Sequence, residues 1–358
     1  MLIILMRKIL LLLLFPFSDY CYAQVEISYS SNSPRECDSI VSQLTEYIPA
    51  GSGGEDAVWD FSGDISTSDT RTIYYSSDST GNMICMEPER MLKFRLTEDS
   101  LLLTGYETHL RKMDYTKPIC LAVFPSVYQD SYGGEFSGSG MYCGRLAIET
   151  EGSYSVEVDG TGSMCLTSGD TIPNVLRLHF LKSASVWMHE PDDTVETDLS
   201  KRRQEIEERY LWYARGYRYP LVESRSVTYY DNLCMVSDTR SSFVSNPEWI
   251  NQLNDSVNQD IQVADSLVNA LQPANPVMNY TMQLDSSGQL HVSYNLTSPA
   301  SLTFLVCNVM GITYMSTTTR REAGEGYSAD FDCSGLTHGT YLLHINCNGQ
   351  VYSETFQR

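Results

Sequence analysis

Basic residues and histidines are scarce in this chain. Lysine and arginine together number 24 against 45 aspartates and glutamates, so the 358 residues carry a formal net charge of -21. Proteins that bind nucleic acid need a basic face for the phosphates, and this balance therefore argues against a nucleic-acid partner. An acidic chain is instead typical of a well-solvated, exported protein.

Several motifs that carry chemistry are absent. The sequence contains no C-x-x-C, no H-E-x-x-H and no G-x-S-x-G, so zinc, redox and serine-nucleophile sites have no support. The glycines from Gly133 to Gly144 are followed by no expected helix and no lysine, which argues against a phosphate-binding loop. His179, His189 and Glu190 lack a third ligand at a diagnostic spacing. We therefore expect no cofactor and no bound metal.

Acidic residues are so common that many pairs of them would suit a glycosidase, which needs two carboxylates across a cleft. Asp60, Asp159 and Asp170 stand in turn or strand contexts. Turn formation explains each of them better than catalysis does. We assign no catalytic residue.

Alternating apolar residues and aromatic residues, including 24 tyrosines, are abundant. Short runs in which every second residue is apolar are typical of half-buried strands. We predict an all-β protein, with an N-terminal β-sandwich-like passenger followed by a C-terminal seven-stranded immunoglobulin-like β-sandwich.

The clearest alternation lies in residues 273–358. In three runs the apolar positions are Leu290, Val292, Tyr294 and Leu296; Leu302, Phe304 and Val306; and Tyr341, Leu343 and Ile345. Successive strand side chains point to opposite faces, so each run predicts one buried face. Asn348-Gly349 suits the tight turn of a hairpin. Counting the runs between turns gives about seven strands, as in an immunoglobulin-like sandwich.

Three motifs stand in order within these residues. They are Asn275-Pro276-Val277, Asn308-Val309-Met310-Gly311-Ile312 and Gly335-Leu336-Thr337-His338-Gly339-Thr340-Tyr341. With them, the last quarter of the chain resembles the C-terminal sorting domain (type A) of type IX secretion cargo. The resemblance implies a β-sandwich that the outer-membrane secretion machinery reads, and that is commonly removed before the cargo is released or attached to the cell surface. The end departs from the family, because Thr355-Phe356-Gln357-Arg358 has an arginine where the family has a lysine-bearing tail.

The N-terminus has the form of a signal peptide. Arg7 and Lys8 precede a short apolar core, and Cys21-Tyr22-Ala23 offers small residues to a signal peptidase. The apolar run is too short for a stable membrane anchor. We predict a signal peptide at residues 1–23, and export through the periplasm to the outer cell surface or the medium. The remaining parts are a passenger at 24–245, a polar, partly helical linker at 246–272, and the sorting-type domain at 273–358.

Within the passenger we predict short strands broken by polar turns. Ile40 to Ile48 suits a strand, and we prefer this to the helix that Ser33-Pro34-Arg35-Glu36 would start. Asp159-Gly160 is expected to turn the chain between two strands. The charged stretch from Asp192 to Glu208 is predicted as a surface excursion, with a short exposed helix as the alternative.

Three passenger segments bear a second resemblance. They are Trp59-Asp60-Phe61-Ser62, Asp159-Gly160-Thr161-Gly162 leading to Asn174-Val175-Leu176-Arg177, and Tyr210-Leu211-Trp212-Tyr213 leading to Pro220-Leu221. These segments resemble functionally unassigned secreted proteins that carry the same sorting domain. The resemblance implies a β-rich passenger without naming an activity.

Cysteines do not dictate a disulfide framework. The full sequence has ten, and nine remain after residues 1–23 are removed. An odd number leaves at least one thiol free or available to another chain. We interpret most of the nine as small buried hydrophobic residues, with one or two disulfide bonds as a further possibility.

Aromatic residues in the passenger are the candidates for ligand binding. A sugar or peptide stacks on exposed aromatic rings, and the candidate platform is Trp187, Trp212, Tyr213 and Tyr217. Packing in the core or across strands is the alternative for all four. We predict a non-enzymatic exported protein whose passenger binds a glycan or protein ligand, or is structural. The alternative function is a secreted hydrolase of glycosides or peptides with its site in the passenger.

Overall fold

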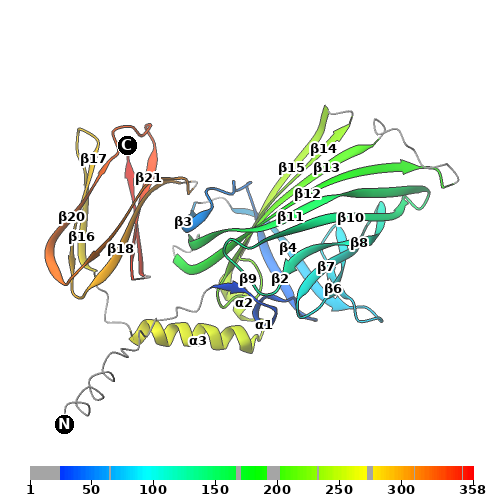
Figure 1. Cartoon of the computed structure of the whole chain (residues 1–358), viewed down its shortest axis with the longest axis horizontal. Coiled ribbons are helices and arrows are strands. Elements are labelled where there is room, and N and C mark those ends of the chain that lie inside the picture. The colour runs from blue at the N-terminus through cyan, green and yellow to red at the C-terminus, as the bar shows by residue number, and fades with distance from the viewer. Residues whose placement is uncertain are drawn as a thin grey trace, which may run out of the picture.

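The computed structural model describes residues 25–63, 66–166, 171–191, 202–231, 234–271, 277–309, 311–348 and 350–358. The predicted signal peptide, the predicted boundary at Pro273 and the candidate Asp170 lie outside these residues. Strands make up most of the described chain, so the all-β prediction is confirmed. Two units lie side by side, which we call the N-terminal unit (residues 25–271) and the C-terminal unit (residues 277–358) (Figure 1).

One large sheet dominates the N-terminal unit. Its strands are β2 (Ser39–Thr45), β3 (Gly54–Asp60), β4 (Ser66–Ser77), β5 (Met83–Met86), β6 (Arg90–Leu96), β7 (Ser100–Thr108), β8 (Arg111–Val123), β10 (Ser131–Tyr142), β11 (Leu146–Cys165), β12 (Thr171–His189), β13 (Arg203–Ala214), β14 (Val222–Asp231) and β15 (Cys234–Ser245). They pair in the order β10-β8-β7-β6-β5-β4-β2-β15-β14-β13-β12-β11-β3, and β10 also pairs with β11.

The β10–β11 pairing closes twelve of the described strands into a barrel-like sheet, which we call the closed sheet, and leaves β3 outside it. A sandwich-like passenger was expected from the alternating strands. The structure differs because the sheet curls until its own ends pair, so one face of the same sheet encloses the core and no second sheet is needed. Alternation along single strands cannot distinguish these two arrangements, since both bury every second residue.

Interior and exterior side chains alternate along the strands of the closed sheet. Leu176, Leu178 and Phe180 occupy alternate positions of β12, and all three lie in the buried interior core. Ile40 lies on β2, so the predicted strand at its position is confirmed. The interior is therefore a packed apolar core along much of its length.

β3 pairs in parallel with the end of β11, beyond the segment of β11 that pairs with β10. Trp59 of β3 and Phe61, just after it, both contact Trp212 of β13 edge to face, with ring centroids 6.2 and 5.2 Å away. Trp59 and Phe61 therefore lie on a common face. This contact makes a second apolar cluster on the outer surface of β11 to β13.

The chain does not turn at Asp159-Gly160, contrary to the prediction. β11 continues through this dipeptide, with a register shift against β12 between Val158 and Gly160. The nearby Gly162 is not part of a turn. A side chain is sterically excluded at this position, because a Cβ atom there would lie 1.8 Å from the carbonyl oxygen of Ala57. Glycine thus permits β3 to pair closely with β11.

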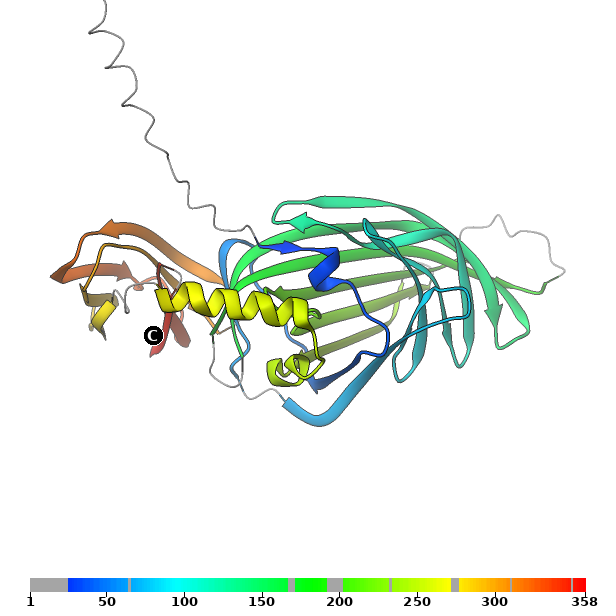
Figure 2. The same cartoon turned by 90° about the horizontal axis from the view of Figure 1, so that it is seen from below.

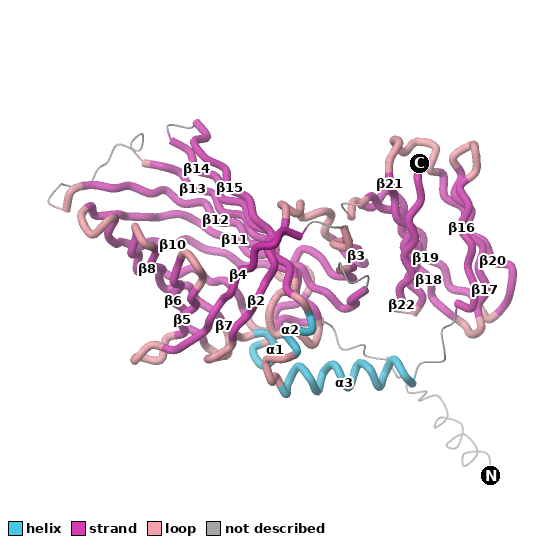
Figure 3. Tube along the Cα trace, turned by 180° about the vertical axis from the view of Figure 1, so that it is seen from behind, coloured by secondary structure: helices cyan, strands magenta, loops and turns pink. Residues whose placement is uncertain are grey.

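Helices gather at one end of the closed sheet (Figures 2 and 3). They are α1 (Tyr29–Asn32), α2 (Pro247–Asn251) and α3 (Ser256–Leu271), and two short strands, β1 (Glu26–Ile27) and β9 (Ser126–Val127), pair near them. Asn246 caps α2 by accepting a hydrogen bond from the backbone N–H of Glu248. In the described residues, the helices lack the length and apolar character that crossing a membrane requires.

Charged residues 203–208 belong to strand β13, so neither the predicted surface excursion nor the alternative helix is found there. Residues 192–201 lie outside the described chain. Glu205 and Glu207 point into the closed sheet, where both bind Lys182. A charged strand is stable in this place because its inward carboxylates meet cations on neighbouring strands.

The C-terminal unit contains seven described strands in two sheets. The strands are β16 (Val277–Leu284), β17 (Gln289–Leu296), β18 (Ala300–Asn308), β19 (Thr313–Arg321), β20 (Gly324–Asp332), β21 (Thr340–Cys347) and β22 (Gln350–Gln357). One sheet has the order β16-β17-β20 and the other β19-β18-β21-β22. Both sheets contribute to one core, which includes all ten apolar residues predicted to point inward and draws on no residue before 280.

The second face of the four-stranded sheet is buried as well. Leu305, Cys307, Leu342 and His344 are at most 5% exposed although they lie outside the core of their own unit. They pair across β18 and β21 on a single face, as register positions 305 with 344 and 307 with 342 show. This face is covered by the N-terminal unit.

β3 and the end of β11 provide the covering surface. Ser163 Oγ lies 3.5 Å from Nε2 of His344, and a Cβ atom on Gly311 would lie 2.8 Å from the carbonyl oxygen of Val58. Burial raises the pKa of the Cys307 thiol to about 12, with Asp60 as a smaller cause. The two units therefore meet face to face in addition to being joined by the chain.

Candidate functional site: a charged pole inside the closed sheet

A cavity of about 120 Å³ lies inside the closed sheet. Most of its wall is apolar, and the wall residues come from strands that face each other across the interior of the closed sheet. Wall residues include Leu92, Phe94, Leu101, Leu178, Phe180 and Leu211. Leu178, Phe180 and Leu211 point inward because they occupy alternate positions of β12 and β13.

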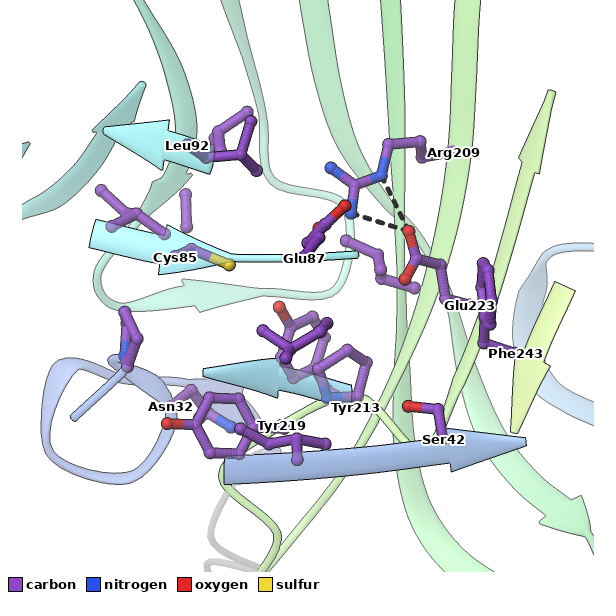
Figure 4. Close-up of a pocket in the computed structure, with 18 of the residues that line it drawn as sticks. Asn32, Ser42, Cys85, Glu87, Leu92, Arg209, Tyr213, Tyr219, Glu223 and Phe243 are labelled. Carbon is purple, nitrogen blue, oxygen red and sulfur yellow. Dashed lines mark hydrogen bonds and ion pairs between the residues drawn. The ribbon is translucent and has the colours of Figure 1, made fainter. Parts of the chain in front are cut away.

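At one side this apolar wall gives way to charged groups. Glu223 accepts bonds from two arginines, with 2.6 Å from its Oε2 to Nη2 of Arg71 and 2.8 Å from its Oε1 to Nη2 of Arg209. Figure 4 shows Arg209 and Glu223 on neighbouring strands, with Glu87 and the Cys85 thiol close by. We call Arg71, Arg209 and Glu223 the charged pole of the cavity.

A second series of ion pairs lies beside the charged pole in the interior. Glu207 binds Arg225 at 2.8 Å and Lys182 at 2.9 Å, and Lys182 also binds Glu205 at 2.9 Å. Glu205 in turn lies 3.7 Å from Arg111. Glu205 and Arg111 line a second cavity of about 260 Å³. This second series therefore extends from beside the charged pole to the wall of the second cavity.

Positive charge is in excess in this interior network. Six cations face four carboxylates, which leaves two positive charges in a chain whose net charge is -21. The cations are Arg71, Arg90, Arg111, Lys182, Arg209 and Arg225, and the carboxylates are Glu87, Glu205, Glu207 and Glu223. The interior thus has the opposite sign to the molecule as a whole.

Two carboxylates of this network, Glu207 and Glu223, stay ionised. Burial would raise the pKa of Glu223, but Arg71 and Arg209 outweigh burial and hold that pKa well below its ordinary value. Burial likewise opposes the charge of Glu207, and Lys182 and Arg225 lower its pKa in spite of burial. A general acid needs a raised pKa, so Glu207 and Glu223 are unsuited to donate a proton.

Arg71 is incompletely satisfied. Its side chain is only 12% exposed, and its guanidinium carbon lies 3.5 Å from the centre of the Phe243 ring. Its Nε–H is fully buried and has no acceptor among the described residues. A buried donor without an acceptor costs about 1–3 kcal/mol. Arg71, a residue of the cavity wall, therefore has one hydrogen-bond donor that is buried and unused.

Below the cavity, residues 28–38 form a plug at the helical end of the closed sheet. Asn32 and Tyr219 line the cavity from this side. Arg218 donates to the backbone oxygens of Ser30 and Ser33 and pairs with Asp255, at the start of α3, at 2.6 Å. Because Arg218 is only 3% exposed, this buried ion pair fixes the plug to α3.

The four aromatic residues predicted as a stacking platform do not share one exposed surface. Trp212 is fully buried against Trp59 and Phe61, and Trp187 is 6% exposed. Tyr217 packs at the edge of the same outer cluster as Trp212. Tyr213 points the other way, into the cavity. Of the four predicted site residues, only Tyr213 belongs to the candidate site.

The histidines that were weighed as metal ligands lie on the outer face. His179 Nε2 is 2.9 Å from Glu208, and its ring stacks on Tyr210 at 4.3 Å. His189 stacks on Trp187 at 4.7 Å. Within the described ranges, no group of three or more histidine, cysteine or acidic side chains is arranged to hold a metal.

The candidate carboxylates stabilise the local structure, and the cysteines form no disulfide bonds among the described residues. Asp159 pairs with Arg177 at 2.8 Å, and Asp60 accepts the backbone N–H of Ser62 in a turn. The nine cysteines of the described chain are free thiols. Burial raises the pKa of Cys85, at the cavity wall, to about 12, so this thiol stays protonated.

Sequence reasoning missed the charged pole. One available signal was the series Glu205, Glu207 and Arg209, in which every second residue is charged. Leu211, the next residue on that face, is apolar, and so is Ile206 on the other face. Such a series predicts a strand with one charged face. Recognising that face as buried requires knowing that Arg71, from a distant strand, supplies the counter-charge.

Comparisons with known proteins add little. No family model matches the sequence. No curated protein matches it either. Among solved structures, dimeric latent PorU from Porphyromonas gingivalis is similar over 89% of this chain and 33% of its own, with 8% identity and a TM-score of 0.20. The chain thus spans a third of PorU, and a likeness at this TM-score carries no argument about fold or function.

Proposed function

We propose that this chain is an exported, cell-surface or secreted binding protein. Its N-terminal unit holds a small ligand inside the closed sheet, and residues 273–358 act as a sorting-type domain for type IX secretion. Binding, and not catalysis, is the activity assigned to the interior. The observation that carries this proposal is the cavity with an apolar wall and the charged pole of Arg71, Arg209 and Glu223. Mostly apolar walls with a few convergent polar groups are typical of ligand sites.

A hydrolase is less well supported by the same site. A retaining or inverting glycosidase needs one carboxyl group with a raised pKa. In the charged network, the pKa values of Glu207 and Glu223 are both lowered by neighbouring cations. Fixed ion pairs of this kind position a ligand better than they transfer a proton.

The C-terminal assignment has support from the residues that suggested it. Two sheets of three and four strands around a separate core suit the predicted immunoglobulin-like sandwich. The Asn308 to Ile312 motif forms the connection from β18 to β19, where Asn308 caps the turn by accepting the backbone N–H of Ile312. Gly339, within the last motif, exchanges two backbone hydrogen bonds with Arg358.

Two experiments test the two halves of the proposal. Deleting residues 273–358 in a bacterium that has type IX secretion should trap the product in the periplasm, whereas unchanged export would contradict the sorting role. For the cavity, Ala122→Leu fills space at the wall and should abolish binding of small apolar ligands such as 1-hexanol, measured by calorimetry. Ala264→Leu, on the exposed surface of α3, is the matched control and should leave binding intact.

A further inference from the structure

The ligand's chemical class can be inferred from the charged pole, given the proposed function on which this inference rests. We propose that the cavity binds a small singly charged acid, with a carboxylate group at Arg71 and an apolar body of about six carbon atoms against the interior wall. Three properties of the cavity lead to this class: an unused donor, an excess of positive charge and a limited volume.

The unused donor is the first property. Arg71 donates to Glu223 through Nη2 and is covered by the Phe243 ring, and its Nε–H remains without an acceptor among the described residues. Nε itself has no room beside it for an oxygen atom in this structure, but Arg71 lines the cavity, so a turn of its side chain toward the cavity would bring the Nε–H to a ligand oxygen. Guanidinium groups match carboxylates well, because the planar fork of N–H donors meets both oxygens.

The charge balance is the second property. Arg71 and Arg209 share the single carboxylate of Glu223, so the pole carries one positive charge in excess. A ligand carboxylate would neutralise that charge, whereas an ammonium group would increase it. The strongly acidic exterior, with a chain net charge of -21, opposes the approach of multiply charged anions such as nucleotides. A ligand with a single negative charge therefore neutralises the charged pole and is repelled least by the acidic surface.

The volume is the third property. The cavity measures about 120 Å³. An apolar cavity of about 150 Å³ accommodates benzene, so a body of about six carbon atoms suits this space. The wall that would surround such a body comes from Leu178, Phe180 and Leu211 on one side and Leu101 on the other. A hexanoate ion combines this size with the required acid group.

Calorimetry on the full chain at pH 7 tests the inference with three ligands of equal chain length: hexanoate, 1-hexanol and hexylamine. We expect hexanoate to bind about tenfold more tightly than 1-hexanol, and hexylamine to bind most weakly, because a charged hydrogen bond contributes about one factor of ten or more. This order is measured on the wild-type chain and needs no variant.

Arg71→Met then localises the effect. It removes the donor and the charge while keeping an unbranched side chain, so hexanoate affinity should fall about tenfold more than 1-hexanol affinity, because only hexanoate loses a charged partner. Arg95→Met, an exposed position on the outside of the same sheet, is the control and should change neither affinity. If Arg71→Met does not fold, the order of the three wild-type affinities decides.

The outcomes separate this inference from the proposed function. Equal affinities for hexanoate and 1-hexanol, both abolished by Ala122→Leu, would overturn the acid class while the cavity remains a binding site. Failure of all three ligands to bind would overturn the proposed function and the inference with it. The expected order, together with a larger loss for hexanoate than for 1-hexanol in Arg71→Met, supports both.

Discussion

The guanidinium of Arg71 and the carboxylate of Glu223 meet inside the closed sheet at 2.6 Å, although their strands β4 and β14 are separated in the sheet by β2 and β15. The pair therefore spans the interior and does not join adjacent strands. Arg209 holds the second oxygen of the same carboxylate. Glu223 is thus the anion on which two buried cations depend.

Glu223→Gln should strongly destabilise the N-terminal unit. Removing one partner of a buried ion pair leaves uncompensated charge, which costs about 3–5 kcal/mol. Here two guanidinium groups lose their counter-charge, so we expect a loss in that range in urea-induced unfolding. The matched control is Glu135→Gln, whose carboxylate pairs with Lys117 on the surface and is 81% exposed. An equal effect of the two substitutions would contradict the account.

His344 should make the contact between the two units sensitive to acid. Burial lowers its pKa from 6.5 to about 4, so the folded chain holds the neutral imidazole while the unfolded chain takes up a proton below pH 6.5. The stability that His344 contributes is complete above pH 6.5 and falls by about 1.4 kcal/mol per pH unit between pH 6.5 and 4. At pH 5 the loss is about 2 kcal/mol relative to pH 7.

Chemical denaturation of the wild type and of His344→Asn at pH 7 and pH 5 measures this effect. Carboxylates contribute equally to both chains, so the difference between them isolates His344. We expect the wild type to lose about 2 kcal/mol more than the variant on acidification. Parallel losses in the two chains would show that the imidazole is not held neutral.

Leu305→Glu should separate the two units. Leu305 is 5% exposed and lies on the face of the C-terminal unit that meets β3 and β11. A buried charge without a partner is unfavourable there, so we expect an increased radius of gyration by small-angle X-ray scattering. Ser301→Glu changes an exposed residue on the same face of β18 and should leave the radius unchanged. Identical scattering of Leu305→Glu and wild type would contradict the interface.

Asp255→Asn should loosen the plug. The substitution weakens the buried pair with Arg218, whose other N–H groups hold the backbone of Ser30 and Ser33. We expect amide hydrogens in residues 29–38 to exchange faster, because the cost of local opening falls. Asp265→Asn is the control, since its pair with Arg215 is about one-third exposed. Exchange that is equally fast in both variants would contradict a specific role for Asp255.

Much of the strand pattern could be predicted from the sequence. Residues such as Leu178 and Val292 alternate with polar neighbours, and alternation reports directly which face is buried. Closure of the sheet could not be predicted, because the hairpin of β10 and β11 closes it only when strands far apart in the sequence, such as β2 and β15, also pair. No local pattern reports those long-range partners.

Burial of polar residues was the main source of error. His344 and Leu342 lie on the face opposite their unit's core, and they are buried only because the N-terminal unit covers them. Glu205 and Glu207 looked solvent-exposed because they are charged, yet Lys182 holds both inside the closed sheet. In each case a partner distant in sequence decides the burial.

The most direct test of the binding site is a crystal structure of the full chain grown with 6-bromohexanoate, in which the bromine is located by its anomalous scattering. We predict a bromine peak inside the closed sheet beside Leu178 and Leu211, with the carboxylate at Arg71. A bromine peak found only on the outer surface, with the charged pole unchanged, would contradict this prediction.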